Sequence, residues 1–186
     1  MKISPTLFGA FLLAKNAISQ PVDGQDPVAK WVDAPLNSYD IPSSKGRSVN
    51  LFYADGFAYY GDSSAWTGSV ITNVTFSFSA NPGALSANAL TDGVTIPDNT
   101  LLYVIPNATS PQPIGFTGSK TTPSGAVTDR WTFYETYASY EDSTGQLNQY
   151  FYIKETDVKG VWQVYWDNAD EVSGYTRITV RNHAPY

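Results

Sequence analysis

The chain has 186 residues, of which 42% are hydrophobic and 15% aromatic, and it carries no cysteine and a formal net charge of -6. Its length suits one domain, or at most two small ones. The composition excludes a disordered, collagen-like or coiled-coil chain, a disulfide-stabilised scaffold and a cysteine-containing zinc site, and the negative charge argues against a nucleic-acid partner.

The first 19 residues have the pattern of a secretory signal peptide. Lys2 supplies a positive charge, residues 7–14 form a short apolar run, and Ala17 and Ser19 place small residues where a signal peptidase cleaves. This run is well short of the ~20 residues that a membrane-spanning helix needs. We therefore predict cleavage after Ser19 and a secreted, extracellular protein without membrane insertion.

Residues 20–48 form a polar N-terminal leader and a first irregular segment, with Pro21 and Pro27 in the leader. From residue 49 onward, short apolar runs alternate with turn residues. No internal repeat and no composition shift divides residues 49–186. We expect these residues to form one domain.

The clearest hairpin signal lies near the start of this domain. Two apolar runs, Asn50–Ala54 and Phe57–Tyr60, are separated only by Asp55 and Gly56. Asp-Gly tolerates the positive φ angles of a type I′ turn, whose twist matches that of the strands it joins. The pattern predicts two antiparallel strands.

Residues 70–80 alternate between apolar and polar side chains, which predicts a strand with one solvated face. Asn73 lies on the solvated side and begins the sequon Asn73-Val74-Thr75; a second sequon, Asn107-Ala108-Thr109, begins in a proline-rich stretch. With a signal peptide present, both asparagines are predicted sites of N-glycosylation.

The rest of the domain also reads as strands and loops. Residues 81–99 predict a loop with room for a helical turn at 83–89, and residues 106–125 predict a long surface loop because they contain four prolines. Further strands are expected at 101–105, 130–140, 147–155, 161–166 and 175–181. The total of eight to nine strands predicts an all-β, antiparallel β-sandwich of immunoglobulin/fibronectin-like or jelly-roll topology.

A sheet spanning residues 130–166 is expected to be aromatic on both faces. A hairpin closed at Thr144-Gly145 would pair Glu135 with Lys154 and place Trp131, Tyr152 and Trp166 on the core face. The other face holds tyrosines that serve either as ordinary strand formers or as a partner site. We predict a binding or dimer surface there, called below the predicted surface: Tyr134, Thr136, Tyr140, Gln163 and Tyr165.

Enzymatic chemistry finds little support in the sequence. A retaining glycosidase needs two carboxylates ~5–5.5 Å apart, but the expected register points Glu135 and Glu155 to opposite faces. The single histidine, His183, is close to the C-terminus, where a Ser-His-Asp triad is not expected. Residues 167–171 could hold calcium or form a plain turn, and the turn is favoured. We predict no catalytic site, cofactor or metal.

The absence of cysteine, the single histidine and methionine, and the Trp- and Tyr-rich strands over Val49–Arg181 resemble the secreted immunomodulatory proteins of mushrooms. That resemblance implies an immunoglobulin- or fibronectin-like sandwich that dimerises and acts on cells. This chain is longer, and it adds a signal peptide and sequons. We expect a non-enzymatic, lectin-like glycoprotein that binds cell-surface glycans or receptors as a homodimer. The alternatives are a small jelly-roll glycoside hydrolase and a wall-associated structural protein.

Overall fold

The computed structural model describes residues 31–78, 80, 82–118 and 122–182, so the predicted signal peptide and His183 lie outside the described residues. Two short 3-10 turns, η1 (Pro42–Ser44) and η2 (Ser63–Ala65), interrupt an otherwise β chain. The described strands are β1 (Trp31–Ala34), β2 (Asn37–Ser38), β3 (Val49–Ala54), β4 (Phe57–Tyr60), β5 (Ile71–Phe78), β6 (Leu85–Ala89), β7 (Leu102–Tyr103), β8 (Gln112–Pro113), β9 (Gly115–Phe116), β10 (Trp131–Tyr134), β11 (Tyr137–Glu141), β12 (Leu147–Asn148), β13 (Phe151–Glu155), β14 (Trp162–Trp166) and β15 (Thr176–Ile178).

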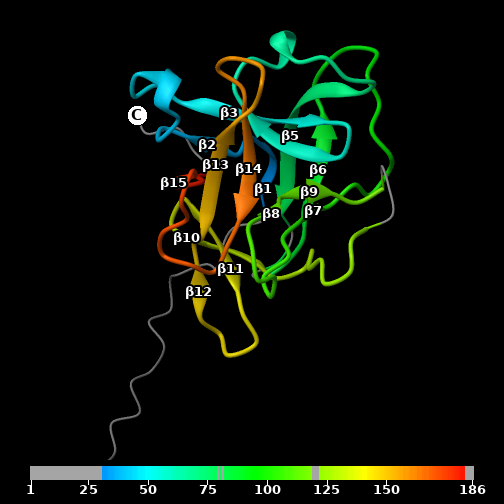
Figure 1. Ribbon diagram of the computed structural model, residues 1–186. Helices are drawn as coiled ribbons and strands as arrows, with labels where there is room; N and C mark the ends of the chain where they lie inside the picture. Colours follow the sequence, from blue (N-terminus) through cyan, green and yellow to red (C-terminus); the bar gives the residue numbers. More distant parts are fainter. Residues whose placement is uncertain (1–30, 79, 81, 119–121, 183–186) are drawn as a thin grey trace, which may run out of the picture.

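The strands form two antiparallel sheets, which confirms the predicted all-β, sandwich-like fold. Among the described residues the main sheet has 12 strands in the central order β1-β5-β3-β4-β14-β13-β15, and the small sheet has the order β10-β11-β12. The small sheet, drawn in yellow, lies at the lower end of the molecule, below the main sheet (Figure 1).

Two local predictions are confirmed in detail. Asp55 and Gly56 have φ angles of 46° and 94°, as a type I′ turn requires, and they join β3 to β4. In β5 the side chains of Val74, Phe76 and Phe78 are buried, while Asn73, just before Val74, is exposed. The period of two along this strand therefore marks a core face and a second face that is solvated at Asn73 but covered at Thr75.

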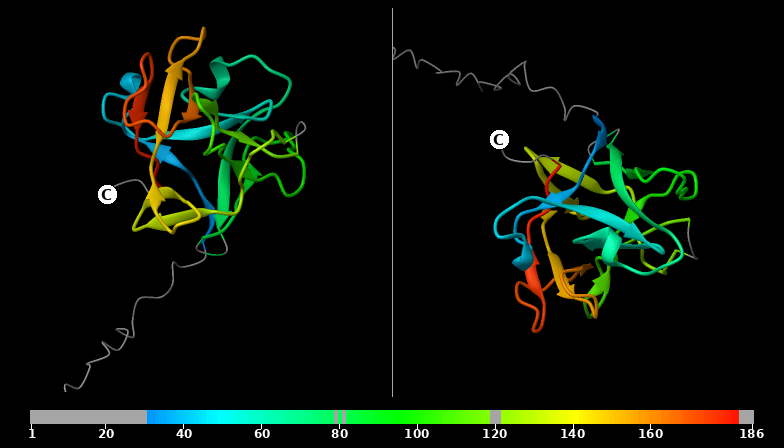
Figure 2. Two further views of the ribbon diagram at one scale, coloured as in Figure 1. Left: turned by 60° about the horizontal axis from the view of Figure 1, so that its bottom comes forward. Right: turned by 90° about the horizontal axis from the view of Figure 1, so that it is seen from above.

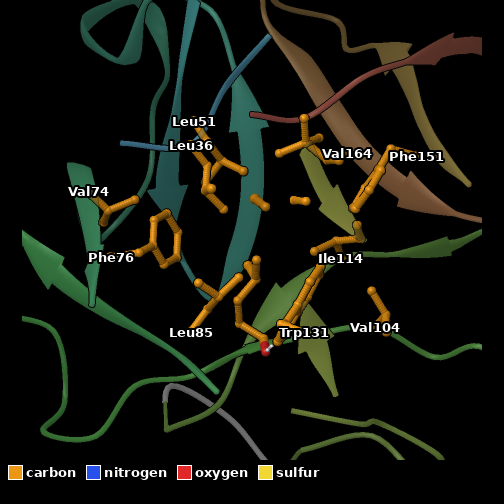
Figure 3. Packing of buried hydrophobic residues seen from close by; sticks show 14 of the residues in the cluster. Leu36, Leu51, Val74, Phe76, Leu85, Val104, Ile114, Trp131, Phe151 and Val164 are labelled. Carbon is orange, nitrogen blue, oxygen red and sulfur yellow. Dashed lines mark hydrogen bonds between the residues drawn. The ribbon is translucent and has the colours of Figure 1, made fainter. Parts of the chain in front are cut away.

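The core joins side chains from both halves of the chain. Figure 3 shows Leu51, Phe76 and Leu85 from early strands facing Trp131, Phe151 and Val164 from late strands. The indole nitrogen of Trp131 donates a 3.0 Å hydrogen bond to the Leu102 carbonyl, so the largest core side chain buries no unpaired donor. Burial of these rings and aliphatic groups supplies the main folding free energy, at ~25 cal/mol per Å² of apolar surface.

Three segments that were expected to be irregular contain strands. Residues 31–48 contribute β1 and β2 and bury Leu36 and Ile41 in the core. Residues 85–89 form β6 along the edge of β5, because pairing with β5 satisfies backbone groups that a helical turn would leave to solvent. Within 106–125, the strands β8 and β9 flank the buried Ile114, and Phe116 in β9 is buried too. Pro113 has no backbone N–H to donate. Proline is tolerated there because the neighbouring Ile114 makes the hydrogen bond to β14, from its N–H to the Val164 carbonyl.

The expected hairpin around Thr144-Gly145 is wrong over most of its length. Residues 130–141 fold on themselves instead: β10 and β11 pair across a two-residue turn in which Glu135 has a φ angle of 54°. The expectation that Tyr152 and Trp166 share the core face requires Tyr152 to lie opposite Val164. β13 pairs with β14 one residue away from that register, so Tyr152 lies opposite Tyr165. Because a shift of one residue exchanges the faces of a strand, Phe151 points into the core.

The ion pair expected between Glu135 and Lys154 is also absent among the described residues. Glu135 lies in the β10–β11 turn of the small sheet, whereas Lys154 lies on β13 of the main sheet, opposite Gln163. The physical reason is the local turn, which closes β10 onto β11 and removes both from β13.

Candidate functional site

The structure divides the predicted surface between two sheets. Tyr134 is 66% exposed at the end of β10, and Thr136 lies in the adjoining turn. Tyr140 is buried and packs edge-on against the Trp166 ring, with 5.7 Å between ring centroids. Gln163 and Tyr165 lie together on the outer face of β14, where the Tyr165 hydroxyl donates a 2.8 Å hydrogen bond to Oε1 of Gln163. Of the predicted surface, Gln163 and Tyr165 thus remain together on one face of the main sheet, apart from Tyr134 and Thr136 on the small sheet.

Gln163 and Tyr165 line a hollow of about 440 Å³ on the outer face of the main sheet. Its other walls come from Trp66 in the loop after η2, from Lys154 on β13, and from residues 155–158 at the β13–β14 turn. We call this the Trp66 hollow. Figure 2 shows the η2 turn beside the orange β13–β14 turn, in agreement with Figure 1.

Trp66 is the outermost ring of a stack that rises from the sheet. Phe52 on β3 stacks on Tyr59 on β4 at 5.5 Å, and Trp66 covers Tyr59 at 4.7 Å, between ring centroids. Phe52 and Tyr59 are buried by this arrangement, whereas Trp66 stays partly exposed. Burial, together with the nearby Tyr165 and Asp55, raises the pKa of Tyr59 to about 12. The stack therefore holds Trp66 in place at the wall of the hollow.

A close backbone approach brings the Trp66 loop against the β13–β14 turn. Gly61 has a φ angle of +130°, and a Cβ added there would lie 2.3 Å from the Gly160 carbonyl oxygen. Only glycine fits both the conformation and the space. Asp62 then caps η2: its Oδ1 accepts hydrogen bonds from the Ser64 hydroxyl at 2.7 Å and from the Ser64 backbone N–H at 2.9 Å, and these two bonds lower the pKa of Asp62.

The β13–β14 turn is fixed by its own side chains. The Thr156 hydroxyl donates to the Val161 carbonyl at 2.9 Å and accepts from the Val158 N–H at 3.2 Å. The Glu155 carboxylate accepts from the Gly160 N–H at 3.2 Å. The wall that carries Glu155 is consequently held by hydrogen bonds within the turn.

The Trp66 hollow combines aromatic and charged groups. The Lys154 ammonium lies 5.3 Å from the centroid of the Tyr175 ring, and Tyr175 packs edge-on against Tyr165 at 5.0 Å. Two acidic side chains, Glu155 and Asp157, also line the hollow. Ring faces beside convergent amide, ammonium and carboxylate groups can bind a polyhydroxylated ring, whose C–H face is apolar and whose rim is polar.

Sequence reasoning missed Trp66 and did not place Lys154 in a site. Trp66 lies in a polar loop outside every predicted strand, so no periodic pattern points to it. The only local signal is the Asp62-Ser63-Ser64 cap, which marks a turn just before the tryptophan.

A larger hollow of about 680 Å³ lies between the β3–β4 turn and the loop at residues 95–97. Its charged group, the Asp55 carboxylate, is already hydrogen-bonded to the backbone. The Asp55 carboxylate accepts hydrogen bonds from the N–H groups of Ser69 and Val70 at 2.8–3.1 Å. This hollow therefore offers a ligand mostly apolar walls and a carboxylate that already has partners.

Other candidate residues are placed as follows. Asn73 and Asn107 are both exposed. In residues 167–171 the Asp167 carboxylate accepts a 2.8 Å hydrogen bond from the Ala169 N–H, which is an ordinary Asx turn, and Asp170 lies 3.8 Å from Arg177. No group of three histidine or acidic side chains suited to a metal occurs within the described ranges.

The described part of the chain contains no helix that is long and apolar enough to cross a membrane. No protein-family model matches the chain, and neither a curated protein nor a solved structure is detectably similar to it.

Proposed function

We propose that this is a secreted, non-enzymatic, lectin-like protein that binds glycans in the Trp66 hollow. The observation that carries the proposal is the placement of a partly exposed Trp66 beside Gln163 and Tyr165 in a preformed hollow of about 440 Å³. That volume is within the range of about 300–1,000 Å³ for small-ligand sites.

In this proposal the side chains of the hollow bind different parts of the sugar. The indole of Trp66 and the phenol of Tyr165 contact the apolar face of a sugar ring, at low cost in side-chain entropy. Because Oε1 of Gln163 already accepts from Tyr165, the amide is oriented with its N–H groups available to sugar hydroxyls. Glu155 and Asp157 accept hydrogen bonds from further hydroxyls.

A glycan array probed with the secreted protein tests the proposal. The parent should bind a defined set of glycans, and both Trp66→Ala and Gln163→Ala should reduce that binding at least tenfold. Leu90→Ala is the matched control, since Leu90 is an exposed apolar side chain that does not line the hollow, and it should bind like the parent. Absence of binding by the parent, or equal binding by all variants, would refute a sugar site here.

A glycoside hydrolase is the second candidate, and one observation favours it: two carboxylates, Glu155 and Asp157, line the same hollow. A reducing-sugar assay against a polysaccharide panel separates the two functions. A hydrolase would release sugar and lose that activity in Glu155→Gln or Asp157→Asn, whereas a lectin would bind the same glycans without releasing sugar.

Cell-surface partners and a homodimer belong to the same proposal, in line with the resemblance to mushroom immunomodulatory proteins. Tyr134, which is 66% exposed on the small sheet, supports self-association through that sheet. Sedimentation of the parent should then give a dimer, and Tyr134→Ala should shift it toward monomer. Failure to bind cells or glycans would leave the wall-associated structural role.

A further inference from the structure

Asn107, the first residue of the second sequon, lies beside a separate polar hollow. Asn107 lines a cavity of about 350 Å³ together with Arg130 and Tyr140, with Asp142 and Gln146 from the β11–β12 hairpin, and with Asn168 beyond β14. We call this the Asn107 hollow. It differs from the Trp66 hollow in every lining residue, and its walls are mostly polar.

The backbone beside Asn107 is held in place by Asn168. The Asn168 side chain donates to the Pro106 carbonyl and accepts a 3.1 Å hydrogen bond from the Trp166 indole nitrogen. Pro106 is buried by this contact, whereas Asn107 is exposed and its side-chain amide hydrogen-bonds to none of the described residues. The asparagine thus sits at a fixed position on the rim with its amide nitrogen available.

The opposite wall is equally well ordered. Arg130 donates from Nε to the Glu141 carbonyl at 2.7 Å and from Nη2 to the Asp142 carbonyl at 2.6 Å. The Asp142 carboxylate accepts from the Thr144 N–H at 2.8 Å and from the Gln146 N–H at 3.1 Å. The Gln146 side chain itself is exposed and makes no hydrogen bond to described residues, so it remains available to a ligand.

We propose that the glycan attached to Asn107 folds back into this hollow and that its first N-acetylglucosamine ties the Pro106 turn to the β11–β12 hairpin. The rim position of Asn107 delivers that sugar into the cavity without a linker. A hollow of about 350 Å³ is near the lower end of the small-ligand range, which suits a single sugar ring. The Gln146 amide can bond its acetamido and hydroxyl groups, and Tyr140 offers a ring edge.

The modification is an ordinary glycosyl transfer and rests on the proposed secretion. A polyprenyl-pyrophosphate-linked oligosaccharide is the donor. A bond forms between Nδ2 of Asn107 and the anomeric carbon, the bond from that carbon to the pyrophosphate oxygen breaks, the pyrophosphate leaves with the electron pair, and one amide proton is lost. Asn73 offers a contrast, since it is exposed on β5 and lines neither hollow.

The test compares thermal midpoints of protein secreted from a eukaryotic host. In an Asn73→Gln background, an amidase that removes the whole Asn107 glycan should lower the midpoint by about 2–4 °C, the shift expected for loss of a few hydrogen bonds in a chain of this size. Because the amidase also hydrolyses Asn107 to aspartate, Thr109→Ala protein, which lacks the sequon but keeps Asn107, should show the same lower midpoint. An endoglycosidase that leaves one N-acetylglucosamine should leave the midpoint unchanged. Neither readout depends on glycan binding at Trp66, so failure of the proposed function would not affect them.

Gln146→Ala supplies the specific control. It should remove most of the difference between glycosylated and deglycosylated protein, because it deletes a contact to the sugar while keeping the backbone bonds of the hairpin. Gln163→Ala, a matched change in the other hollow, should preserve that difference. An unmodified Asn107, an equal midpoint with and without the glycan, or an equal loss on removing the Asn73 glycan in an Asn107→Gln background would overturn the proposal.

Discussion

Asn37 and Arg181 exchange two backbone hydrogen bonds, of 2.8 and 2.9 Å, although they are far apart in the sequence. The next residues along the chain extend the contact toward the small sheet, where the Val180 carbonyl accepts from the Ala138 N–H and the Asn182 N–H donates to the Thr136 carbonyl. Residues 180–182 therefore lie between β2 and β11, and they connect the two sheets.

Deleting residues 180–186 should destabilise the fold strongly. Four backbone hydrogen bonds are lost at about 1 kcal/mol each, and the buried Val180 side chain is removed with them. A loss of about 4 kcal/mol or more is a large part of the 5–15 kcal/mol expected for a domain. Urea unfolding, monitored by tryptophan fluorescence, measures this loss in the free energy of unfolding. Deleting only residues 183–186 is the control, because all four bonds are kept, and equal stability of both truncations would contradict the role given to residues 180–182.

Two aromatic residues on the same strand should respond very differently to truncation. Trp131 is buried in the core and Tyr134, three residues later on β10, is 66% exposed. Trp131→Ala should cost about 3–5 kcal/mol, while Tyr134→Ala should change stability by about 0.5 kcal/mol or less. Chemical denaturation of both variants checks this. A large loss in Tyr134→Ala, measured at a concentration where the chain is monomeric, would contradict the exposed position of Tyr134.

The parts of the fold that the sequence predicts correctly are those with short-range signals. Asp55-Gly56 specifies its own turn, and the alternation of residues 71–78 specifies the buried face of β5. The β10–β11 turn escaped prediction because Glu135 adopts a positive φ without glycine, which few non-glycine residues do. Once that turn is missed, the pairing partner of β11 is wrong, and the faces of β11 and β13 are exchanged, whereas Trp166 on β14 still faces the core as expected.

In the candidate site, too, short-range patterns predict some residues, and tertiary contacts decide the others. Gln163 and Tyr165 could be placed on one face because they are two residues apart on a strand. Trp66 could not, since the close approach of Gly61 to Gly160 is a tertiary contact that leaves no periodic trace in the sequence. Tyr140 was assigned to a surface but is buried, because its strand belongs to a different sheet from β14.

The Asp142 carboxylate should make stability depend on pH in the acid range. Hydrogen bonds from Thr144, Gln146 and Asn148 lower its pKa from the ordinary 3.8 to about 2. A lowered pKa in the folded state stabilises the fold above the unfolded value, and this contribution is lost as pH falls from about 4 through 2. Asp142→Asn should therefore be less stable at pH 7 and show a flatter thermal midpoint between pH 4 and 2.

The matched variant for this titration is Asp98→Asn. Asp98 is exposed, and its carboxylate hydrogen-bonds to none of the described residues. Its pH profile of thermal midpoints, measured by circular dichroism, should follow that of the parent. If Asp142→Asn also follows the parent from pH 7 to 2, the hydrogen bonds of the β11–β12 hairpin do not lower the pKa of the Asp142 carboxylate in solution.

Gly61→Ala should separate the Trp66 loop from the β13–β14 turn. At φ +130° an alanine is strained, and its Cβ would meet the Gly160 carbonyl oxygen at 2.3 Å, so the backbone has to move. We expect about 1–2 kcal/mol of conformational strain and about 1–3 kcal/mol from the clash. Gly145→Ala is the control, since Gly145 has a φ of +85° with nothing within 4 Å, and it should show the strain alone.

Because displacement of the loop moves Trp66 away from Gln163, Gly61→Ala should also weaken glycan binding, and Gly145→Ala should not. Denaturation gives the stability of both variants, and acrylamide quenching of tryptophan fluorescence reports the displaced ring. Equal stability and equal quenching in the two variants would show that the approach of Gly61 to Gly160 does not position Trp66.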